Sequence, residues 1–417
     1  MSFERVRQAA SSILGSSTGV AALQRKSPDD VVITMAIRSP LCKARKGGFK
    51  DMRSDELLTE MFKQAIAHAK IDPTLIGDIC VGTVLPPGAA YEARTAALAA
   101  GIPESVPVQT INRFCSSGLM ATTTISNQIR AGQIEVGLAV GVESMTFNPD
   151  SGPGSASDEI KSVSCAADAL QPMGWTSENV AGDFKISRED MDAFAALSFQ
   201  RAERAQQTGA FDNEIVPFTA LQKDGADAGV RKKVVVTKDD GVRAGTTKET
   251  LGKIKAAFPQ WAPAQTTGGN ASQITDGAAA VLLMTRRKAE ELGLPVLAKH
   301  VTTAVAGVAP RIMGIGPSAA IPKVLALAGI TKEDVDLFEI NEAFASMYVY
   351  CVRKLGLDIE KVNVNGGAIA LGHPLGATGA RQIATGLNAL KHRNGKVLVT
   401  SMCIGTGMGA AAVFVVD

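Results

Sequence analysis

Short apolar runs alternate along most of the chain with longer segments in which apolar residues recur at helical spacing. The runs Val31–Ile37, Asp78–Val84 and Val136–Val142 are typical of buried strands. The segment that begins at Ser54 places its apolar residues on one stripe, and we expect Ser54 to cap that helix. Because strands and amphipathic helices alternate in this way, the chain is predicted to have an α/β fold.

The order of the predicted elements repeats in the two halves of the chain. The first half contains the strand Asp78–Val84, a strand that runs into Cys115, the helix Ser117–Arg130 and the strand Val136–Val142. The second half repeats this order with Val335–Ile340, Val362–Asn365, Gly379–Lys391 and Lys396–Ser401. Few residues are identical between the copies, so the prediction depends on element order. It indicates two duplicated βαβ-rich halves whose loops meet at one cleft.

The composition changes between residues 148 and 265. Residues 149–157 are rich in Gly, Ser and Pro, an amphipathic helix is predicted over Arg188–Gln206, and the stretch Lys223–Lys248 is charged and turn-rich. The regular pattern resumes with the apolar strand Ala278–Met284. The predicted organisation is a tail over residues 1–30, an N-terminal core over 31–147 completed by 266–296, an inserted loop domain over 148–265, and a C-terminal core over 297–417.

Composition and charge exclude several classes of protein. The chain has 417 residues, 46% of them hydrophobic, and a formal net charge of +2 with acidic and basic residues interspersed. This balance provides no basic surface for nucleic acid and no polybasic patch for a membrane. No apolar run approaches the roughly 20 residues of a membrane-spanning helix, so membrane insertion is not expected. The six cysteines are scattered and only four histidines occur, which argues against a disulfide framework and a metal site.

Two turns carry side chains that can act as nucleophile and base. Cys115 lies between a predicted strand and a predicted helix, where the helix dipole and free N–H groups are expected to lower the pKa of a thiol. His373 lies between Gly372 and Pro374, and a neutral imidazole there can take the proton of Cys115. The alternative for each is a structural role, as a small buried cysteine and as a histidine satisfied within a turn.

Cys403 and Asn341 add two further groups. Cys403 precedes a run of glycines and can be a second thiol that moves a proton, while the N–H of Gly405 points at a substrate oxygen. Asn341 ends a predicted strand and offers an uncharged amide that can position a water molecule. A cysteine–histidine pair with a second cysteine fits acyl transfer through a thioester, with a further group that handles a carbon acid.

These motifs carry a resemblance to a known family. Four segments resemble the active-site loops of the thiolase family: Asn112–Gly118, Asn341–Phe344, Gly372–Pro374 and Cys403–Gly405. Two more, Gly268–Ser272 and Gly141–Met145, resemble its other markers, and the similarity runs from about residue 31 to residue 417. Within the family, the stretch Ala181–Arg188 is most similar to the fungal peroxisomal 3-ketoacyl-CoA thiolases.

The resemblance implies a five-layered αβαβα thiolase fold and a role for each matched residue. Cys115 would accept the acyl group. His373 would activate it and then form one oxyanion hole with a water held by Asn341. Cys403 would be the acid/base at the acetyl α-carbon, and the N–H groups of Cys115 and Gly405 would form the second oxyanion hole. CoA and acyl-CoA would be substrates, with no cofactor. The residues expected to line the CoA channel are Arg243, Ala271, Ser272, Met313, Phe344 and Met173.

The predicted function is thiolytic cleavage of 3-ketoacyl-CoA in fatty-acid β-oxidation, and the alternative is a biosynthetic acetoacetyl-CoA thiolase. The chain has Pro172 where biosynthetic enzymes commonly have the His of His-Met-Gly, which favours the degradative branch. Ketoacyl synthases typically use two histidines where this chain has His373 and Cys403, and hydroxymethylglutaryl-CoA synthases use a glutamate. A non-catalytic acyl-CoA or lipid-binding protein on this scaffold would be expected to lack at least one of the four loops.

The N-terminal tail resembles a targeting segment. Arg5 and Val6 begin the peroxisomal nonapeptide pattern, but Ser12 and Ile13 stand where its last two residues belong. We therefore expect a peroxisomal enzyme recognised by an import receptor through a degenerate signal, with the cytosol or the mitochondrion as alternatives. The resemblance also implies a homodimer.

Overall fold

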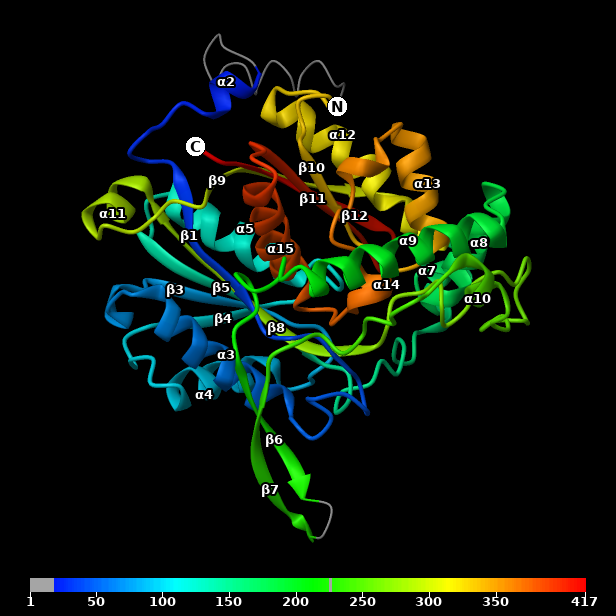
Figure 1. The fold of residues 1–417 in the computed structure, drawn as a ribbon, viewed down its shortest axis with the longest axis horizontal. Coiled ribbons are helices and arrows are strands. Elements are labelled where there is room, and N and C mark those ends of the chain that lie inside the picture. The colour runs from blue at the N-terminus through cyan, green and yellow to red at the C-terminus, as the bar shows by residue number, and fades with distance from the viewer. Residues whose placement is uncertain (1–18, 225–226) are drawn as a thin grey trace.

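The structure, a computed structural model, describes residues 19–224 and 227–417. Its main feature is one sheet of ten strands. The sheet is narrow at its centre, where β1 (Val31–Arg38) and β9 (Ala298–Gly307) pair at two positions only. The molecule therefore consists of two half-sheets that meet at this junction (Figure 1). The predicted targeting motif, which falls within residues 1–18, lies outside the described residues.

Of the remaining strands of this sheet, five belong to the N-terminal half-sheet and three to the C-terminal one. Those of the N-terminal half are β2 (Cys42–Lys43), β3 (Asp78–Gly82), β4 (Val108–Ile111), β5 (Val136–Ser144) and β8 (Thr275–Thr285). Those of the C-terminal half are β10 (Leu337–Ile340), β11 (Val397–Ile404) and β12 (Met408–Val415). Outside both lies the hairpin of β6 (Phe218–Asp224) and β7 (Asp227–Val236).

The two half-sheets have the same topology. The N-terminal one runs β1-β8-β5-β3-β4, and the C-terminal one runs β9-β12-β11-β10. In each, the last strand in sequence, β8 or β12, is antiparallel to both neighbours, and the strands beyond are parallel. The predicted strand Val362–Asn365 is reduced to a single bridge between Phe338 and Val362, at the place that β4 takes in the first half. The duplication predicted from element order is therefore confirmed.

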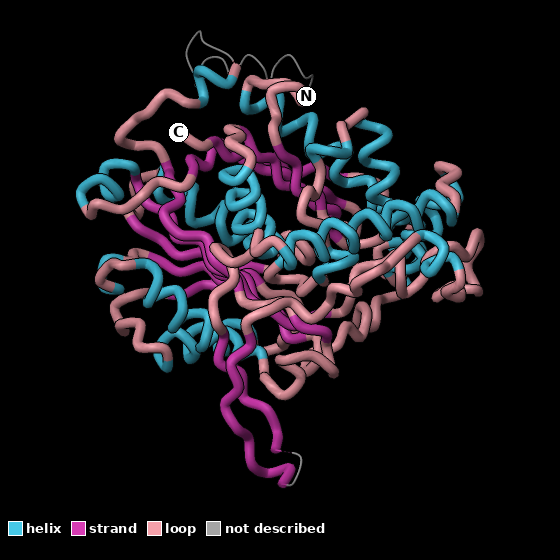
Figure 2. Tube along the Cα trace, in the orientation of Figure 1, coloured by secondary structure: helices cyan, strands magenta, loops and turns pink. Residues whose placement is uncertain are grey.

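Helices form three layers around the half-sheets (Figures 1 and 2). Helices α3 (Ser54–Ala69) and α4 (Ala89–Ala99) cover the outer face of the first half-sheet, and α12 (Gly316–Ala328) and α13 (Ala345–Leu355) cover that of the second. Between the half-sheets, α5 (Ser117–Arg130) packs against α15 (Thr378–His392). Successive strand residues serve different layers, because strand side chains alternate between faces. The result is the predicted αβαβα order.

The strands of the first half-sheet show this alternation directly. In β8, Leu282 and Met284 belong to the outer core with α3 and α4, whereas Val281 and Leu283 belong to the central core with α5 and α15. All nine residues of β5 are buried. A strand covered on both faces reads as a continuous apolar run, which is why these strands were predictable from sequence.

The segment 148–265 leaves the layers after β5 and returns to them before β8. Its helices are α6 (Asp158–Ser162), α7 (Ser164–Asp168), α8 (Met173–Asp183), α9 (Arg188–Gln207) and α10 (Lys248–Gly252). Helix α9 packs against α13 and against the short α14 (Ala368–Leu371), which precedes His373. The inserted segment therefore lies against the turn that contains His373. The short elements outside it are α2 (Val20–Leu23), α11 (Arg286–Glu291), η1 (Pro73–Leu75), η2 (Pro310–Ile315) and η3 (Ile359–Lys361).

One local prediction is wrong, and two strands were missed. Ser54 is the first residue of α3 rather than its cap, which is Arg53, because the Ser54 hydroxyl donates to Glu92 Oε2 at 2.5 Å instead. The first part of Lys223–Lys248 forms strand β7 of a hairpin that projects from the body (Figure 1). Residues 229–236 of β7 are exposed or half-buried, so the charged residues of this strand did not indicate it. Strand β12 was missed because Gly407 and Gly409 obscure its apolar run.

Within residues 19–224 and 227–417, no helix has both the length and the apolar character needed to cross a membrane.

Candidate active site

Cys115 lies in the turn between β4 and α5. The turn is closed by Ser117, whose hydroxyl donates to Phe114 O at 2.7 Å and accepts from Arg113 N–H at 2.9 Å. Phe114 has a φ of 46°, in the left-handed region that few non-glycine residues adopt. This backbone places Cys115 at the start of α5 with 8% of its surface exposed. The N–H of Cys115 itself and that of Gly405 face its sulfur.

The thiol of Cys115 is not ionised in this environment. Burial raises its pKa to about 11, and the charges of Asp150 and Glu143 act in the same direction. The two N–H groups lower the pKa but by less than burial raises it. The prediction that the start of the helix lowers this pKa is therefore wrong in its net direction, because the thiolate loses more hydration than the N–H groups replace.

The imidazole of His373 is held as one neutral tautomer. The Thr378 hydroxyl donates to Pro374 O at 2.9 Å, so it accepts from His373 Nδ1, which lies 2.6 Å away. Nδ1 therefore carries the proton and Nε2 keeps its lone pair, toward which Asn341 Nδ2 donates at 3.2 Å. Burial, assisted by the positive charge of Arg381, lowers the pKa of His373 to about 3. The ring is thus a neutral base whose Nε2 carries no proton.

Cys403 and Asn341 lie on neighbouring strand ends. Cys403 is near the end of β11, and burial, with Cys115 and Cys351 nearby, raises its pKa well above the usual thiol value. Its sulfur lies 3.9 Å from Met347 Sδ. Asn341 follows β10, and its N–H donates to Ser401 O of β11 at 2.9 Å. Within the described part of the chain Asn341 Oδ1 is buried and has no hydrogen-bond partner, so it is free to accept from water or substrate.

Glycines allow the two catalytic turns to touch through their backbones. A Cβ at Gly118 would lie 2.7 Å from Gly376 O, and one at Gly141 would lie 2.4 Å from the same oxygen. A Cβ at Gly379 would lie 2.2 Å from Leu119 N. Real Cβ atoms do not approach so closely, so these positions admit only glycine. The starts of α5 and α15, and with them Cys115 and His373, are thereby brought to one place.

Five of the six predicted CoA-channel residues lie beside these groups. Met173, Met313 and Phe344 pack in one cluster with Cys403. Ala271 forms an isolated bridge with Phe344, and the N–H of Ser272 donates to Ala343 O at 2.9 Å.

Arg243 lies at the outer end of this set. Its Nη2 is 3.3 Å from Gly268 O, and its guanidinium lies 5.3 Å from the centre of the Phe199 ring. It therefore touches the start of the Gly268–Ser272 loop rather than the reacting groups.

Sequence reasoning missed four residues that hold the site. Thr378 fixes the His373 tautomer, Met347 packs against Cys403, and two buried carboxylates, Glu143 and Glu342, bind the surrounding loops. Glu143 and Glu342 fall within the motifs that were recognised, yet nothing in a sequence shows what a buried carboxylate binds. Thr378 is five residues beyond His373, and no pattern distinguishes it from an ordinary helix-start threonine.

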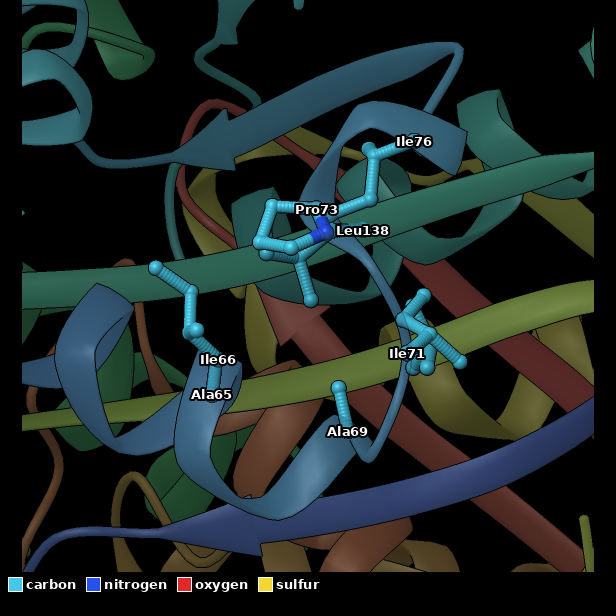
Figure 3. Close-up of a pocket in the computed structure, with 8 residues that line it drawn as sticks. Ala65, Ile66, Ala69, Ile71, Pro73, Ile76 and Leu138 are labelled. Carbon is cyan, nitrogen blue, oxygen red and sulfur yellow. The ribbon is translucent and has the colours of Figure 1, made fainter. Parts of the chain in front are cut away.

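A small pocket in the N-terminal half is separate from this site (Figure 3). It lies between the end of α3, the segment after it, and strands β5 and β8. Its lining is entirely apolar: Ala65, Ile66, Ala69, Ile71, Pro73, Ile76, Leu138 and Leu282. It offers no group for chemistry. The described residues also contain no cluster of three His, Cys, Asp or Glu side chains that could hold a metal ion.

Comparisons with known proteins identify the family of the chain. The family model "Thiolase, N-terminal domain" matches residues 31–287, and "Thiolase, C-terminal domain" matches residues 294–416. The chain is 53% identical over 403 residues to the peroxisomal 3-ketoacyl-CoA thiolase of Yarrowia lipolytica, covering 96% of each protein. It is 53% identical over 410 residues to peroxisomal 3-ketoacyl-CoA thiolase B of Rattus norvegicus, covering 98% of this chain and 96% of the rat protein.

Among solved structures, the dimeric peroxisomal thiolase of Saccharomyces cerevisiae superposes with a TM-score of 0.88 at 48% identity. That match covers 95% of this chain and 100% of the yeast one.

Proposed function

This chain belongs to the thiolase family, and from that premise we propose that it is a 3-ketoacyl-CoA thiolase (acetyl-CoA C-acyltransferase) of fatty-acid β-oxidation. Such an enzyme cleaves 3-ketoacyl-CoA with CoA to give acetyl-CoA and an acyl-CoA that is two carbons shorter. The observation that carries the proposal is the convergence of two thiols, a neutral imidazole and an amide from four loops of two duplicated halves. Relatives that share about half of its residues over nearly full length carry that name.

In the first step, the Cys115 sulfur attacks the 3-keto carbon while His373 Nε2 takes the thiol proton. Both groups are neutral before attack, since the pKa of Cys115 is about 11 and that of His373 about 3. The proton must therefore move as the carbon–sulfur bond forms, because a stored thiolate–imidazolium pair is disfavoured. The N–H groups of Cys115 and Gly405 face the sulfur and so lie next to the carbon it would bond, where they can stabilise the oxyanion.

In the second step, the bond between C2 and C3 breaks and its electron pair passes to the acetyl-CoA enolate. Cys403 gives its proton to that carbon, which releases acetyl-CoA and leaves a thiolate on Cys403. Its raised pKa suits this role, since a weakly acidic thiol is better matched to a carbon acid. The amide of Asn341, which holds His373 Nε2 and has a free oxygen, can position a water molecule beside the imidazole.

In the third step, the thiol of incoming CoA gives its proton to Cys403 and attacks the Cys115 thioester. The shortened acyl-CoA leaves, and His373 returns its proton to the Cys115 sulfur, so both thiols are restored. These steps need no cofactor, and CoA enters only as substrate. We assign the approach of CoA to Met173, Arg243, Ala271, Ser272, Met313 and Phe344, which extend from Cys403 to the Gly268 loop.

We also propose that the chain forms a homodimer. The yeast relative with the same fold is described as dimeric. In this chain β4 is the outermost strand of its half-sheet and pairs only with β3 among the described strands, which leaves one edge of it open. Beside it, Tyr91 of α4 is 83% exposed and Phe114 is 40% exposed. An open edge flanked by exposed aromatic rings suits a second copy of the chain, and light scattering at micromolar concentration tests it.

The proposed location is the peroxisome, since the relatives at 53% identity are named peroxisomal. The receptor would read the N-terminal segment that begins Arg5-Val6. Fusing residues 1–30 to a fluorescent protein tests this. Punctate fluorescence that overlaps a peroxisomal marker supports it, and diffuse or mitochondrial fluorescence contradicts it.

The experiment that tests the activity uses purified protein and 3-ketoacyl-CoA esters of four to sixteen carbons, with acetyl-CoA release followed as CoA is added. We expect cleavage that extends to medium and long chains and that chelators do not reduce. Activity confined to acetoacetyl-CoA would move the protein to the biosynthetic branch, and absence of CoA-dependent cleavage would overturn the proposal.

A further inference from the structure

Glu143, at the end of β5, is completely buried and binds both halves of the catalytic site. Its Oε2 accepts from the N–H of Gly376, at 2.9 Å, and from that of Val84, at 3.0 Å. Its Oε1 accepts from the N–H of Leu85 at 3.1 Å and from the Thr83 hydroxyl at 3.3 Å. These four hydrogen bonds of one carboxylate join the loop after β3 to the turn that contains His373, and we call them the Glu143 bracket.

The first arm of this bracket leads to His373. Gly376 is three residues beyond His373, in the same turn, and its Cα faces the backbone of residues 82, 83 and 142 at distances that leave no room for a Cβ. The turn is thus pressed against the first half-sheet and bonded there by the carboxylate. Movement of this turn would move Nε2 of His373 away from the Cys115 turn.

The second arm leads to Cys115. Asn112 Nδ2 donates to Val84 O at 3.1 Å, and Asn112 Oδ1 accepts from the N–H of Phe114, at 2.9 Å. The loop that Glu143 holds is therefore tied through one side chain to the residue directly before Cys115. Two segments that carry the base and the nucleophile are positioned by the same carboxylate.

The charge of Glu143 is not neutralised by a nearby cation. All four donors are uncharged, and no ion pair forms with it within residues 19–224 and 227–417. Burial raises its pKa to about 7, although its donors oppose this. Its negative charge and that of a Cys115 thiolate disfavour each other, as the raised pKa of Cys115 reflects. Asp150 acts on Cys115 in the same sense.

We propose that Glu143 is a positioning residue of the reaction: its carboxylate fixes the His373 turn against the Cys115 turn through its hydrogen bonds to Gly376 and to the loop after β3. The proposal rests on the thiolase function argued above. A carboxylate with a purely structural role would not be expected to affect both the rate of catalysis and the ionisation of Cys115. Loss of the bracket slows catalysis, whereas loss of the charge makes the Cys115 thiolate easier to form.

The test compares Glu143→Gln with the unaltered protein in two assays, both in a Cys165→Ser background because Cys165 is the exposed cysteine of the described residues. In either orientation the NH₂ group of Gln faces at least one backbone N–H donor, so the bracket loses at least one hydrogen bond. We expect kcat for thiolysis to fall roughly 10- to 100-fold with little change in the KM for CoA. We expect iodoacetamide to alkylate Cys115 several-fold faster at pH 8, as mass spectrometry would show.

Two further variants separate the effects. Asn112→Ala cuts the second arm and keeps the charge, so kcat should fall while the pH dependence of alkylation is unchanged. Asp78→Asn removes another buried carboxylate, which binds Gln109 and Gln128 at the opposite end of β3, and should alter neither kcat nor alkylation. If Glu143→Gln keeps normal kcat, the positioning role is wrong.

Alkylation separates the remaining cases. The charge effect should fade below about pH 6, where Glu143 is mostly protonated because its pKa is about 7. Acceleration by the same factor at about pH 5.5 and about pH 8.5 would mean that Glu143→Gln merely loosens the fold, and would overturn the charge effect. Because alkylation needs no acyl-CoA, that half of the test remains valid even if the chain cleaves no 3-ketoacyl-CoA, an outcome that would count against the proposed function alone. A folded Glu143→Gln protein is verified by its circular dichroism, and the Asn112→Ala variant tests the bracket if it does not fold.

Discussion

The hydroxyl of Thr378 lies 2.6 Å from Nδ1 of His373 and donates a hydrogen bond to the carbonyl of Pro374. The imidazole therefore has only one tautomer available, with Nε2 unprotonated. In hydrolytic triads a carboxylate plays the corresponding part and stabilises the imidazolium as well. A hydroxyl orients the ring without stabilising a positive charge. His373 is thus suited to brief proton transfer within the attack rather than to holding a proton.

Replacing Thr378 by Val should lower kcat by roughly 10- to 100-fold, because the ring loses the acceptor that selects its tautomer. Thr378→Ser keeps the hydroxyl and should restore most of the rate. Steady-state thiolysis of one medium-chain 3-ketoacyl-CoA measures both variants. Equal rates for Val and Ser would mean that the hydroxyl does not orient the base.

Cys115→Ser should reduce thiolysis by roughly three orders of magnitude or more, since an alcohol is far less acidic and less nucleophilic than a thiol. Mass spectrometry of the unaltered protein mixed with 3-ketoacyl-CoA, without CoA, should show an acyl adduct on the peptide that contains residue 115. The variant should show none. An adduct on Cys403 in its place would reassign the nucleophile.

Cys403→Ser should separate the half-reactions. Transfer of an acyl group from acyl-CoA to Cys115 should continue slowly, because it needs no carbon acid. Exchange of acetyl-CoA methyl protons with deuterated solvent should be lost, since that exchange requires the acid/base at the α-carbon. Mass spectrometry of recovered acetyl-CoA follows the exchange, and an undiminished rate would remove Cys403 from the mechanism.

Alkylation of Cys115 should depend on pH as expected for a raised pKa. Because the thiol pKa is about 11, the thiolate fraction and the alkylation rate should rise about tenfold for each pH unit from 7 to 10. An ordinary thiol would level off above about pH 9. The measurement uses the Cys165→Ser protein with iodoacetamide and peptide mass spectrometry. A rate already constant below pH 8 would show that Cys115 is ionised at rest.

Gly118→Ala should destabilise the protein by about 1–3 kcal/mol or more, because the new carbon would overlap the carbonyl of Gly376. The matched control is Gly88→Ala, where nothing lies within 4 Å of the added carbon and φ is negative. Its effect should stay within about 0.5 kcal/mol. Urea unfolding of both variants provides the comparison. Similar losses in the two would show that the close approach of the turns is not what Gly118 provides.

Sequence patterns predicted the fold well wherever burial on both faces produces an unbroken apolar run, as in β5 and β8. They failed at β7, whose residues 229–236 are exposed or half-buried, and at the cap of α3, where Ser54 binds Glu92 instead. Cys115, His373 and Cys403 could be proposed as site residues because glycine or proline lies in their turns, and Asn341 because it ends a predicted strand. The groups that position them were not, since Thr378 and Glu143 act through contacts made between segments far apart in sequence. The sequence pattern also could not show that burial raises the pKa of Cys115.

The place of β8 in the first half-sheet means that this half-sheet cannot be completed until long after β5 has been synthesised. β8 lies between β1 and β5, yet roughly 130 residues separate the end of β5 from its start. At about 5–20 residues per second, a ribosome needs roughly 7 to 26 s to make that stretch. During this interval the nascent chain holds β1 without either sheet neighbour, and β5 presents an open apolar edge. We therefore expect chaperones that bind exposed strand edges to associate with the nascent chain until residue 285 has emerged.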